Sequence, residues 1–262
     1  MKVQDMFNLS GKTAIVTGGG RGIGRFIAQG LAEAGANVVV ASRKLENCQK
    51  AADEMKSLGV KTLAVKLDLA KKEDIRNLLD VTVKEFGKID ILVNNAGQTW
   101  GAPTLEFPQE KWDMIFDVNI RGLWMISQMT ARLMKDSGGG VMINVSSIHG
   151  ERGSLEEAHP AVAYNSSKAA VNILTMNLAV KLARYGIRVN AIAPGPFKTD
   201  MMKYLWKPEM KPILDLMINH VPLRKVGEED DIKALAVFLA SPASGYITGA
   251  VVPCDGGIMA KQ

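Results

Sequence analysis

The chain has 262 residues, of which 47% are hydrophobic and 23% are charged, a composition typical of globular proteins with a large buried core. The formal net charge is +5, but basic and acidic residues are mixed along the chain, which argues against a nucleic-acid partner. No apolar run is long enough to span a bilayer, and the first ten residues lack the pattern of a signal peptide. We therefore expect a cytoplasmic protein without a membrane partner.

The cysteines and histidines form no pattern of a disulfide or a metal site. Cys48 and Cys254 lie far apart in the chain, and His149, His159 and His220 lack the spacing of zinc ligands. We expect neither a structural disulfide nor a bound metal.

The first motif is a glycine-rich loop between a predicted strand, residues 12–17, and a predicted helix, residues 25–35. Such a loop lets a pyrophosphate approach the backbone closely, and the helix N-terminus offers free N–H groups and a positive dipole end. The first gap between the glycines is longer than in the G-x-G-x-x-G pattern. The sequence predicts dinucleotide binding, with contacts from Gly18, Arg21, Gly22, Ile23 and Gly24.

The second predicted strand, residues 37–41, ends in Ser42-Arg43-Lys44. An acidic residue there would accept hydrogen bonds from the ribose 2′-hydroxyl of NAD and repel the 2′-phosphate of NADP. This chain has a hydroxyl and two cations instead, and a guanidinium suits a phosphate because it can donate two parallel hydrogen bonds. We predict NADP(H) as the favoured cofactor and NAD(H) as the alternative, with contacts from Ser42 and Arg43. If this is wrong, Arg43 and Lys44 only cap a solvated loop.

Apolar runs of strand length alternate with helical patterns along the rest of the chain. The predicted strands are residues 61–67, 89–93, 141–145, 187–193 and 249–253, and the predicted helices are 45–58, 71–86, 110–136, 164–185 and 228–240. This alternation predicts an α/β Rossmann fold: a doubly wound, seven-stranded parallel sheet with helices on both faces, in a single domain over residues 1–262. Ligands of such sheets bind at the carboxyl ends of the strands.

Polar or small residues stand at four of these strand ends. Asp68-Leu69 follows the third strand, Asn94-Asn95-Ala96-Gly97 the fourth, Ser146-Ser147 the fifth and Pro194 to Thr199 the sixth. Serines at a strand end also form ordinary turns, which is the alternative for both. Asn119 stands inside the predicted helix 110–136, where its amide competes for backbone hydrogen bonds, so we expect a kink or a bound water there.

Tyr164 and Lys168 stand four residues apart at the start of a predicted helix, so their side chains share one face. A tyrosine that acts as a general acid or base at neutral pH needs its pKa lowered by roughly 3 units, about 4 kcal/mol. A neighbouring ammonium group favours phenolate over phenol and is a direct way to lower that pKa. The alternative is an ordinary aromatic residue beside an ordinary solvated lysine.

Residues 200–220 are rich in methionine, aromatic residues and lysine, after a proline–glycine break. Adaptable side chains in such a place predict a mobile cover over the site, residues 197–220. A packed pair of helices is the alternative.

These motifs together resemble the short-chain dehydrogenase/reductase family, and the resemblance covers residues 9–257. The T-G-x-x-x-G-x-G motif of the family is matched by residues 17–24, its N-N-A-G by residues 94–97 and its Y-x-x-x-K by Tyr164 and Lys168. Ser147, which precedes x-x-G after the fifth strand, and Asn119 in the long helix match the two other catalytic positions. The resemblance implies an oxidoreductase whose catalytic residues are Asn119, Ser147, Tyr164 and Lys168.

The resemblance also implies a role for each residue. Tyr164 would exchange a proton with a carbonyl or alcohol oxygen that Ser147 holds, and Lys168 would lower the tyrosine pKa and bind the nicotinamide ribose. Asn119 would hold a water that links Lys168 to solvent. The remaining cofactor contacts would come from Asp68 and Leu69, from Asn95, Ala96 and Gly97, and from Pro194, Gly195 and Thr199. The family is commonly tetrameric, and residues 247–257 resemble its subunit interface.

The substrate is less closely defined. Trp100 and the small residues after it resemble bacterial 3-oxoacyl-acyl-carrier-protein reductases and gluconate 5-dehydrogenase-like members, and we expect Trp100, His149, Phe197 and Tyr204 to contact the substrate. The apolar cover favours a 3-oxoacyl thioester. A keto-sugar acid or polyol is the alternative, followed by a steroid or other hydrophobic ketone, and by a regulatory protein that only senses NADP(H).

One departure from the family affects the substrate prediction. Tyr164 follows Ser147 by 17 residues, a longer gap than in many members, with the extra residues around 156–159. They would lie near the mouth of the pocket, so relatives are a poor guide to the substrate.

Overall fold

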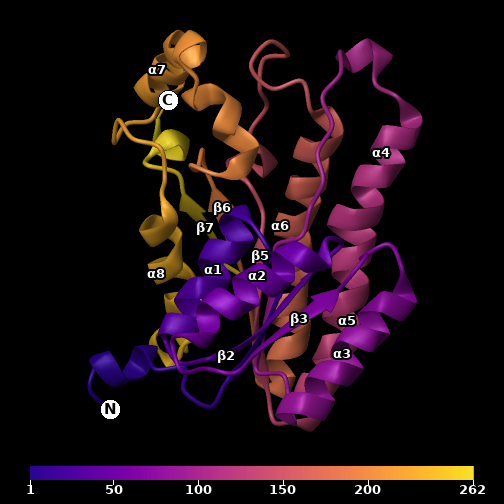
Figure 1. The fold of residues 1–262 in the computed structure, drawn as a ribbon. Coiled ribbons are helices and arrows are strands. Elements are labelled where there is room, and N and C mark those ends of the chain that lie inside the picture. The colour runs from indigo at the N-terminus through magenta and orange to yellow at the C-terminus, as the bar shows by residue number, and fades with distance from the viewer. Residues whose placement is uncertain (262) are drawn as a thin grey trace.

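The computed structural model describes residues 1–261, without the side chain of Met201; Gln262, the last residue of the predicted domain, lies outside the described residues. At the centre is a seven-stranded parallel sheet in the order β3-β2-β1-β4-β5-β6-β7 (Figure 1). The strands are β1 (Thr13–Thr17), β2 (Asn37–Ser42), β3 (Thr62–Lys66), β4 (Ile91–Asn94), β5 (Gly140–Val145), β6 (Ile187–Pro194) and β7 (Val251–Cys254). The order reverses between β1 and β4, which confirms the predicted doubly wound Rossmann-like fold.

Helices cover both faces of the sheet, because the strands are apolar on both sides. In β1, Ala14 and Val16 pack into one core, and Ile15 packs into the other. The first core holds α1 (Gly22–Glu33), α2 (Leu45–Lys56) and α8 (Glu229–Ala240), and the second holds α3 (Lys72–Phe86), α5 (Leu123–Asp136) and α6 (Val162–Leu182). None of the helices in residues 1–261 is both long and apolar enough to cross a membrane.

The long helix predicted over residues 110–136 is divided by a π-helical turn. α4 (Gln109–Phe116) leads into the turn at Asp117–Gly122, and α5 continues from Leu123. Gly122, the last residue of the turn, packs closely on the loop after β3, since a Cβ there would lie 2.8 Å from Leu69 Cβ. A single π turn inside an α-helix is often a functional feature, and this one contains Asn119.

Residues 200–220 form two short 3-10 segments, Asp200–Trp206 and Pro208–Met210, followed by α7 (Lys211–His220). They pack on a small core of their own around Leu205, Leu214 and Val226, separate from the two cores of the sheet. Figure 1 shows α7 and the loop that precedes α6 at the same end of the molecule, at the top of the view. The predicted cover falls in one of these segments, and we use the name cover below for both, residues 151–161 and 197–220.

Candidate active site

Tyr164 and Lys168 lie at the start of α6, where the sequence places them. Val162 is the first residue of α6, so Tyr164 is in its first turn, and Lys168 follows one turn later on the same face. The Lys168 ammonium lies 5.5 Å from the centroid of the Tyr164 ring. Lys168 is only 5% exposed, and its Nζ donates a 2.7 Å hydrogen bond to the carbonyl of Val145 at the end of β5.

The end of β5 brings Ser147 to the same place. Ser146 donates a hydrogen bond from its Oγ to the Lys168 carbonyl (3.1 Å), which fixes the strand end against α6. Ser147 is buried and begins a short turn, where its Oγ accepts a hydrogen bond from the His149 backbone N–H (3.2 Å). The x-x-G after Ser147 also has a physical reason, because a Cβ on Gly150 would lie 2.7 Å from the Lys168 backbone.

The structure corrects the predicted direction of the tyrosine pKa. Burial raises the pKa of Tyr164 above its usual value, and a hydrogen bond with the Ser147 side chain only partly opposes that effect. Burial also lowers the pKa of Lys168 to about 8. The prediction from spacing was wrong because it counted the charge of the lysine and not the desolvation of both groups.

Asn119 ties the loop after β4 to α6. Its Oδ1 accepts from the Gln98 N–H (2.8 Å), and its Nδ2 donates to the Gln98 carbonyl (2.9 Å) and to Ser167 Oγ (2.9 Å). Ser167 in turn donates to the Tyr164 carbonyl (2.7 Å). Gly97 lies beside this junction, since a Cβ there would be 3.3 Å from Asn119 Oδ1 and 3.6 Å from Lys168 Nζ. Asn119 therefore holds the loop after β4 against α6, a role that the sequence did not indicate.

The glycine-rich loop is held from below by Asn95. Asn95 Nδ2 donates to the carbonyls of Thr17 (3.0 Å) and Gly18 (3.2 Å). Gly18 and Gly22 have positive φ angles of 66° and 54°, and a Cβ on Gly24 would lie 2.5 Å from the Gly18 carbonyl oxygen. The loop thus leaves an open backbone at the N-terminus of α1, as the pyrophosphate of a dinucleotide requires. Ile23 packs against the first core.

Thr17, the first residue of the T-G-x-x-x-G-x-G motif, is a buried link between β1 and β4. Its Oγ1 donates to the Val93 carbonyl (3.2 Å) and accepts from the N–H groups of Asn95 and Ala96, both at 3.1 Å. The Thr17 hydroxyl thus joins the T-G motif to the N-N-A-G motif by hydrogen bonds. The presence of a hydroxyl residue at this position of the motif is the signal that could have identified its role.

The two arginines predicted at the cofactor phosphate line different cavities. Arg21 lines a cavity of about 370 Å³ between the glycine-rich loop, α2 and the cover, together with the cations Arg25, Lys50, Lys198 and Lys203 and the carboxylates Glu54 and Asp200. Arg43 lines a second cavity of about 410 Å³, with Asp68 and Gln98. Ser42 Oγ is engaged locally, donating to the Lys44 carbonyl (3.2 Å) and contacting Cys48 Sγ (3.0 Å).

Of the remaining predicted cofactor residues, Thr199 lines the cavity of Arg21, whereas Leu69, Pro194 and Gly195 line neither cavity. Leu69 is buried against Gly122, and Thr199 reaches the glycine-rich loop, with its Cβ 3.6 Å from where a Cβ on Gly22 would stand. Pro194 is the last residue of β6, and Gly195 lies so close to Asp255 that a Cβ would be 2.8 Å from its Cα.

The four predicted substrate residues differ in how exposed their side chains are to solvent. Phe197 is 3% exposed and packs in the first core against Gly227, and its contact with substrate stays a prediction. Gly227 leaves the space that draws the ring inward. Trp100 and Tyr204 are exposed, and the Lys111 ammonium lies 4.4 Å from the centroid of the Trp100 ring.

His149 stacks on His159, a residue that the sequence placed only in an insertion. The ring centroids are 3.9 Å apart and the planes differ by 11°. His159 also lies edge-on to Tyr164, with centroids 5.9 Å apart. His159 therefore lies beside the tyrosine, with His149 stacked on it.

Comparisons with known proteins are consistent with this geometry. A family model described as enoyl-(acyl carrier protein) reductase matches residues 18–259. Among curated relatives, 7alpha-hydroxysteroid dehydrogenase of Escherichia coli is 36% identical (97% of this chain, 96% of the relative). The 5-keto-D-gluconate 5-reductase of E. coli is 34% identical (98% and 99%), and the 3-oxoacyl-acyl-carrier-protein reductase of Staphylococcus epidermidis is 37% identical (94% and 98%).

Solved structures give the same result. A short-chain type dehydrogenase/reductase from Mycobacterium marinum is 38% identical with a TM-score of 0.92 (98% of this chain, 99% of that chain). A gluconate 5-dehydrogenase from Burkholderia cenocepacia, in complex with NADP and tartrate, is 34% identical with a TM-score of 0.91 (100% of both chains). A 7 alpha-hydroxysteroid dehydrogenase, complexed with NADH and 7-oxo glycochenodeoxycholic acid, is 35% identical with a TM-score of 0.90 (98% of both chains).

Proposed function

The chain belongs to the short-chain dehydrogenase/reductase family, whose members act on alcohol and keto groups, and from that premise we propose its mechanism, cofactor and substrate class. It interconverts a ketone and a secondary alcohol, with Tyr164 as the general acid or base. The observation that carries this proposal is the buried Lys168 beside Tyr164, with the buried Ser147 at the end of β5 near enough to affect the pKa of that tyrosine.

Each residue of the site has its own role in the proposed reaction. The cofactor supplies or accepts the hydride. Tyr164 gives a proton to the carbonyl oxygen during reduction, or takes it from the alcohol during oxidation, and Ser147 orients that oxygen by a hydrogen bond. Lys168 holds a positive charge or a donor near the tyrosine, where burial keeps it from solvent. Asn119 keeps α6 and the loop after β4 in register, and a water held there would connect Lys168 to solvent.

NADP(H) is the cofactor that fits the charges best. Arg43 follows β2, where an acidic residue would favour NAD, and Arg21 stands in the glycine-rich loop. The gluconate 5-dehydrogenase structure contains NADP, whereas the 7 alpha-hydroxysteroid dehydrogenase structure contains NADH, so relatives of similar identity differ in cofactor. Asp68 and Leu69 would meet the adenine end, and Asn95, Ala96, Pro194, Gly195 and Thr199 would line the rest of the cofactor path.

A 3-oxoacyl thioester is the first candidate substrate. The apolar core of the cover, around Leu205 and Leu214, and the relative from S. epidermidis favour it. The lysines of the cover add little support for a charged carrier group, since Lys203 pairs with Asp200 and Lys211 with Asp215 (2.7 Å). A keto-sugar acid is the second candidate, favoured by the histidine pair beside Tyr164 and by the relative that reduces 5-keto-D-gluconate.

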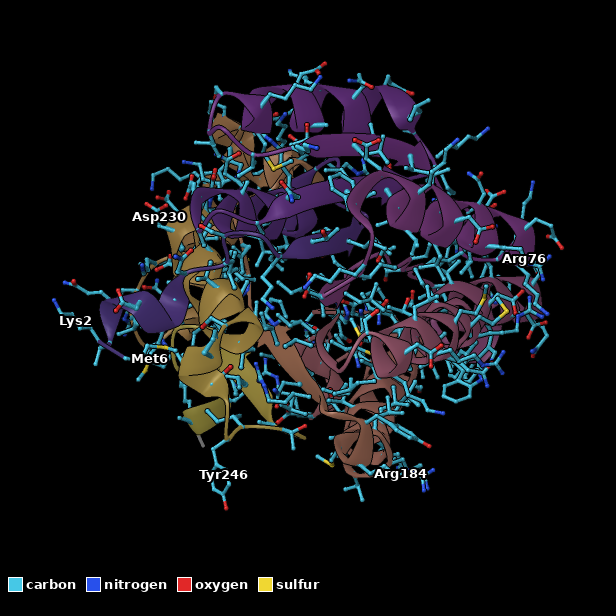
Figure 2. The ribbon with its side chains drawn as sticks, turned by 90° about the horizontal axis from the view of Figure 1, so that it is seen from below. Lys2, Met6, Arg76, Arg184, Asp230 and Tyr246 are labelled. Carbon is cyan, nitrogen blue, oxygen red and sulfur yellow. The ribbon has the colours of Figure 1, made fainter. Side chains whose placement is uncertain are left out.

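We also propose that the chain forms a homotetramer and acts in the cytoplasm. Ile173, Met176 and Val180 make an exposed apolar stripe on α6, with exposed fractions of 60%, 45% and 81%. Trp124 on α5 is exposed as well. In Figure 2, Tyr246, just before the predicted interface segment 247–257, projects away from the body of the molecule. A second copy would remove these apolar side chains from water.

Initial rates of NADPH and NADH oxidation, measured side by side with acetoacetyl thioester and 5-keto-D-gluconate, test these proposals. We expect carbonyl-dependent turnover that is faster with NADPH. Turnover with NADH alone would contradict the cofactor, and the better of the two carbonyl compounds identifies the substrate class. Absence of turnover with both compounds and with a 7-oxo steroid would contradict the proposed reaction.

A further inference from the structure

The cavity between the glycine-rich loop, α2 and the cover is lined by more positive than negative side chains, five basic and two acidic. On one side α2 packs tightly on the loop, because a Cβ on Gly20 would lie 3.0 Å from Asn47 Cβ. On the other side the cover reaches the loop through Thr199, whose Cβ is 3.6 Å from where a Cβ on Gly22 would stand. Three separate parts of the chain therefore build this cavity.

Both carboxylates of the cavity are already paired with cations. Arg25 on α1 pairs with Glu54 on α2 at 2.7 Å, and Lys203 in the cover pairs with Asp200. The hydrogen bond from Lys203 lowers the pKa of Asp200, and the charges of Arg21 and Arg25 lower it further. The cavity thus keeps an excess of positive charge after its internal ion pairs are formed.

Two basic side chains of the cavity, Arg21 and Lys50, form no ion pair within residues 1–261. The fifth, Lys198, lies 3.6 Å from a carboxylate oxygen of Glu228 and 5.0 Å from the centroid of the Trp206 ring. Arg21 and Lys50 are both exposed to solvent, and they come from different elements. These two cations are therefore free to bind an anion in the same cavity.

The position of Lys50 in α2 explains why it lines this cavity. Lys50 follows Asn47 by three residues and precedes Glu54 by four, and all three line the cavity. Residues three or four apart share one face of a helix, so this face of α2 lies toward the glycine-rich loop. Lys56, near the end of α2, does not line the cavity and pairs instead with Asp53 at 2.7 Å.

Arg43, the other arginine predicted at the 2′-phosphate, lies in more acidic surroundings. The cavity that Arg43 lines is also lined by four carboxylates, Asp68, Glu110, Asp113 and Asp117. Like charges repel, so these carboxylates offset the attraction of the Arg43 guanidinium for a phosphate dianion. A 2′-phosphate therefore needs a further source of positive charge besides Arg43.

We propose that Lys50 is a further specificity-determining residue for the cofactor, which binds the 2′-phosphate of NADP(H) together with Arg21. This inference rests on the proposed preference for NADP(H), and Lys50 adds to Arg43 without replacing it. The ammonium group stands on a flexible four-carbon stem, and the Arg21 guanidinium can donate two parallel hydrogen bonds to a phosphate. NAD(H) has a neutral hydroxyl in place of this phosphate, so it gains little from the charge of Lys50.

Binding of NADP⁺ and NAD⁺ without any carbonyl or alcohol substrate tests this role, since the two differ only in the 2′-phosphate. Titration calorimetry gives both Kd values for wild type, Lys50→Gln and Lys50→Arg. We expect Lys50→Gln to raise Kd for NADP⁺ about three- to tenfold and Kd for NAD⁺ less than about twofold, and Lys50→Arg to keep the wild-type values. Lys56→Gln removes a charge from the same helix outside the cavity and should change neither value.

The outcomes separate the role of Lys50 from the proposed function, because no turnover is measured. Wild type that binds NADP⁺ no more tightly than NAD⁺ would contradict the proposed cofactor and this inference with it. Tighter binding of NADP⁺ that Lys50→Gln leaves unchanged would overturn the role of Lys50 alone. An equal loss for both cofactors would also overturn it, since the lost contact would then not be with the 2′-phosphate.

Discussion

The floor of the site, formed by the ends of β1, β4 and β5 and by the first turns of α6, differs from the cover in how deeply its polar groups are buried. In the floor, Asn94 Nδ2 donates to Ser127 Oγ and Asn144 Oδ1, both at 2.9 Å, and Asn144 donates to Thr175. Asn94 and Asn144 are both buried, whereas the ion pairs of Lys203 and Lys211 in the cover lie in solvent. A buried, connected network fixes the geometry of the floor, whereas exposed ion pairs contribute little to holding the cover.

The burial of Lys168 in the floor of the site lowers the free energy of unfolding at neutral pH. Because burial lowers its folded pKa to about 8, the unfolded chain binds more protons between about pH 8 and 10.5, and stability rises with pH across that window. We expect Lys168→Met to be more stable than wild type at pH 7, and to lose this advantage by pH 10.5, a change on the order of 3 kcal/mol. Urea unfolding at a series of pH values measures it.

Lys207→Met, at an exposed lysine of the cover, controls for the loss of one positive charge. A pH dependence shared by both variants would show that the effect does not come from burial of Lys168.

Paired glycine substitutions compare the packing of the two regions directly. A Cβ on Gly24 would meet the Asn95 amide nitrogen and the Gly18 carbonyl, whereas a Cβ on Gly153 in the cover has no neighbour within 4 Å. We expect Gly24→Ala to lower the free energy of unfolding by about 2 kcal/mol and Gly153→Ala to change it by less than about 0.5 kcal/mol. Losses of the same size would contradict the contrast between floor and cover.

A substitution of Arg43 tests its predicted contact with the 2′-phosphate of the cofactor. We expect Arg43→Asp to raise KM for NADPH about tenfold and to leave KM for NADH nearly unchanged, because a carboxylate repels the 2′-phosphate and can accept from a 2′-hydroxyl. Arg76→Asp on α3, an exposed residue at the periphery in Figure 2, makes the same charge change away from the site. A rise in KM for both cofactors in Arg43→Asp would contradict discrimination at the 2′ position.

The fold could be predicted because its signals are local and strong. The strands are apolar on both sides, and the glycine-rich loop, N-N-A-G and Ser147 each follow a strand, so parallel pairing brings them together. For the long helix, the sequence predicted an irregularity only at Asn119. The close approach of Gly122 to Leu69 could not be predicted, because it joins segments that are distant in the chain.

The parts that could not be predicted depend on burial and on the loop. The spacing of Tyr164 and Lys168 shows that they share a face but not how deeply they are buried, and burial raises the pKa of Tyr164, so the predicted direction of that pKa was wrong. The burial of Phe197 in the first core could not be predicted, because the glycine that accepts its ring, Gly227, is 30 residues further along the chain. The stacking of His159 on His149 follows from an insertion without periodicity, which gives no signal in sequence.

The central claim is that Tyr164 is the proton-transfer group of this site, and Tyr164→Phe tests it most directly. Turnover of the best carbonyl substrate and the Kd for NADPH are measured in this variant and in Tyr185→Phe, whose ring lies at the far end of α6 beside Arg184. We predict that Tyr164→Phe lowers kcat about 10²- to 10⁴-fold with an unchanged Kd for NADPH, while Tyr185→Phe changes neither. Full turnover in Tyr164→Phe would contradict the mechanism.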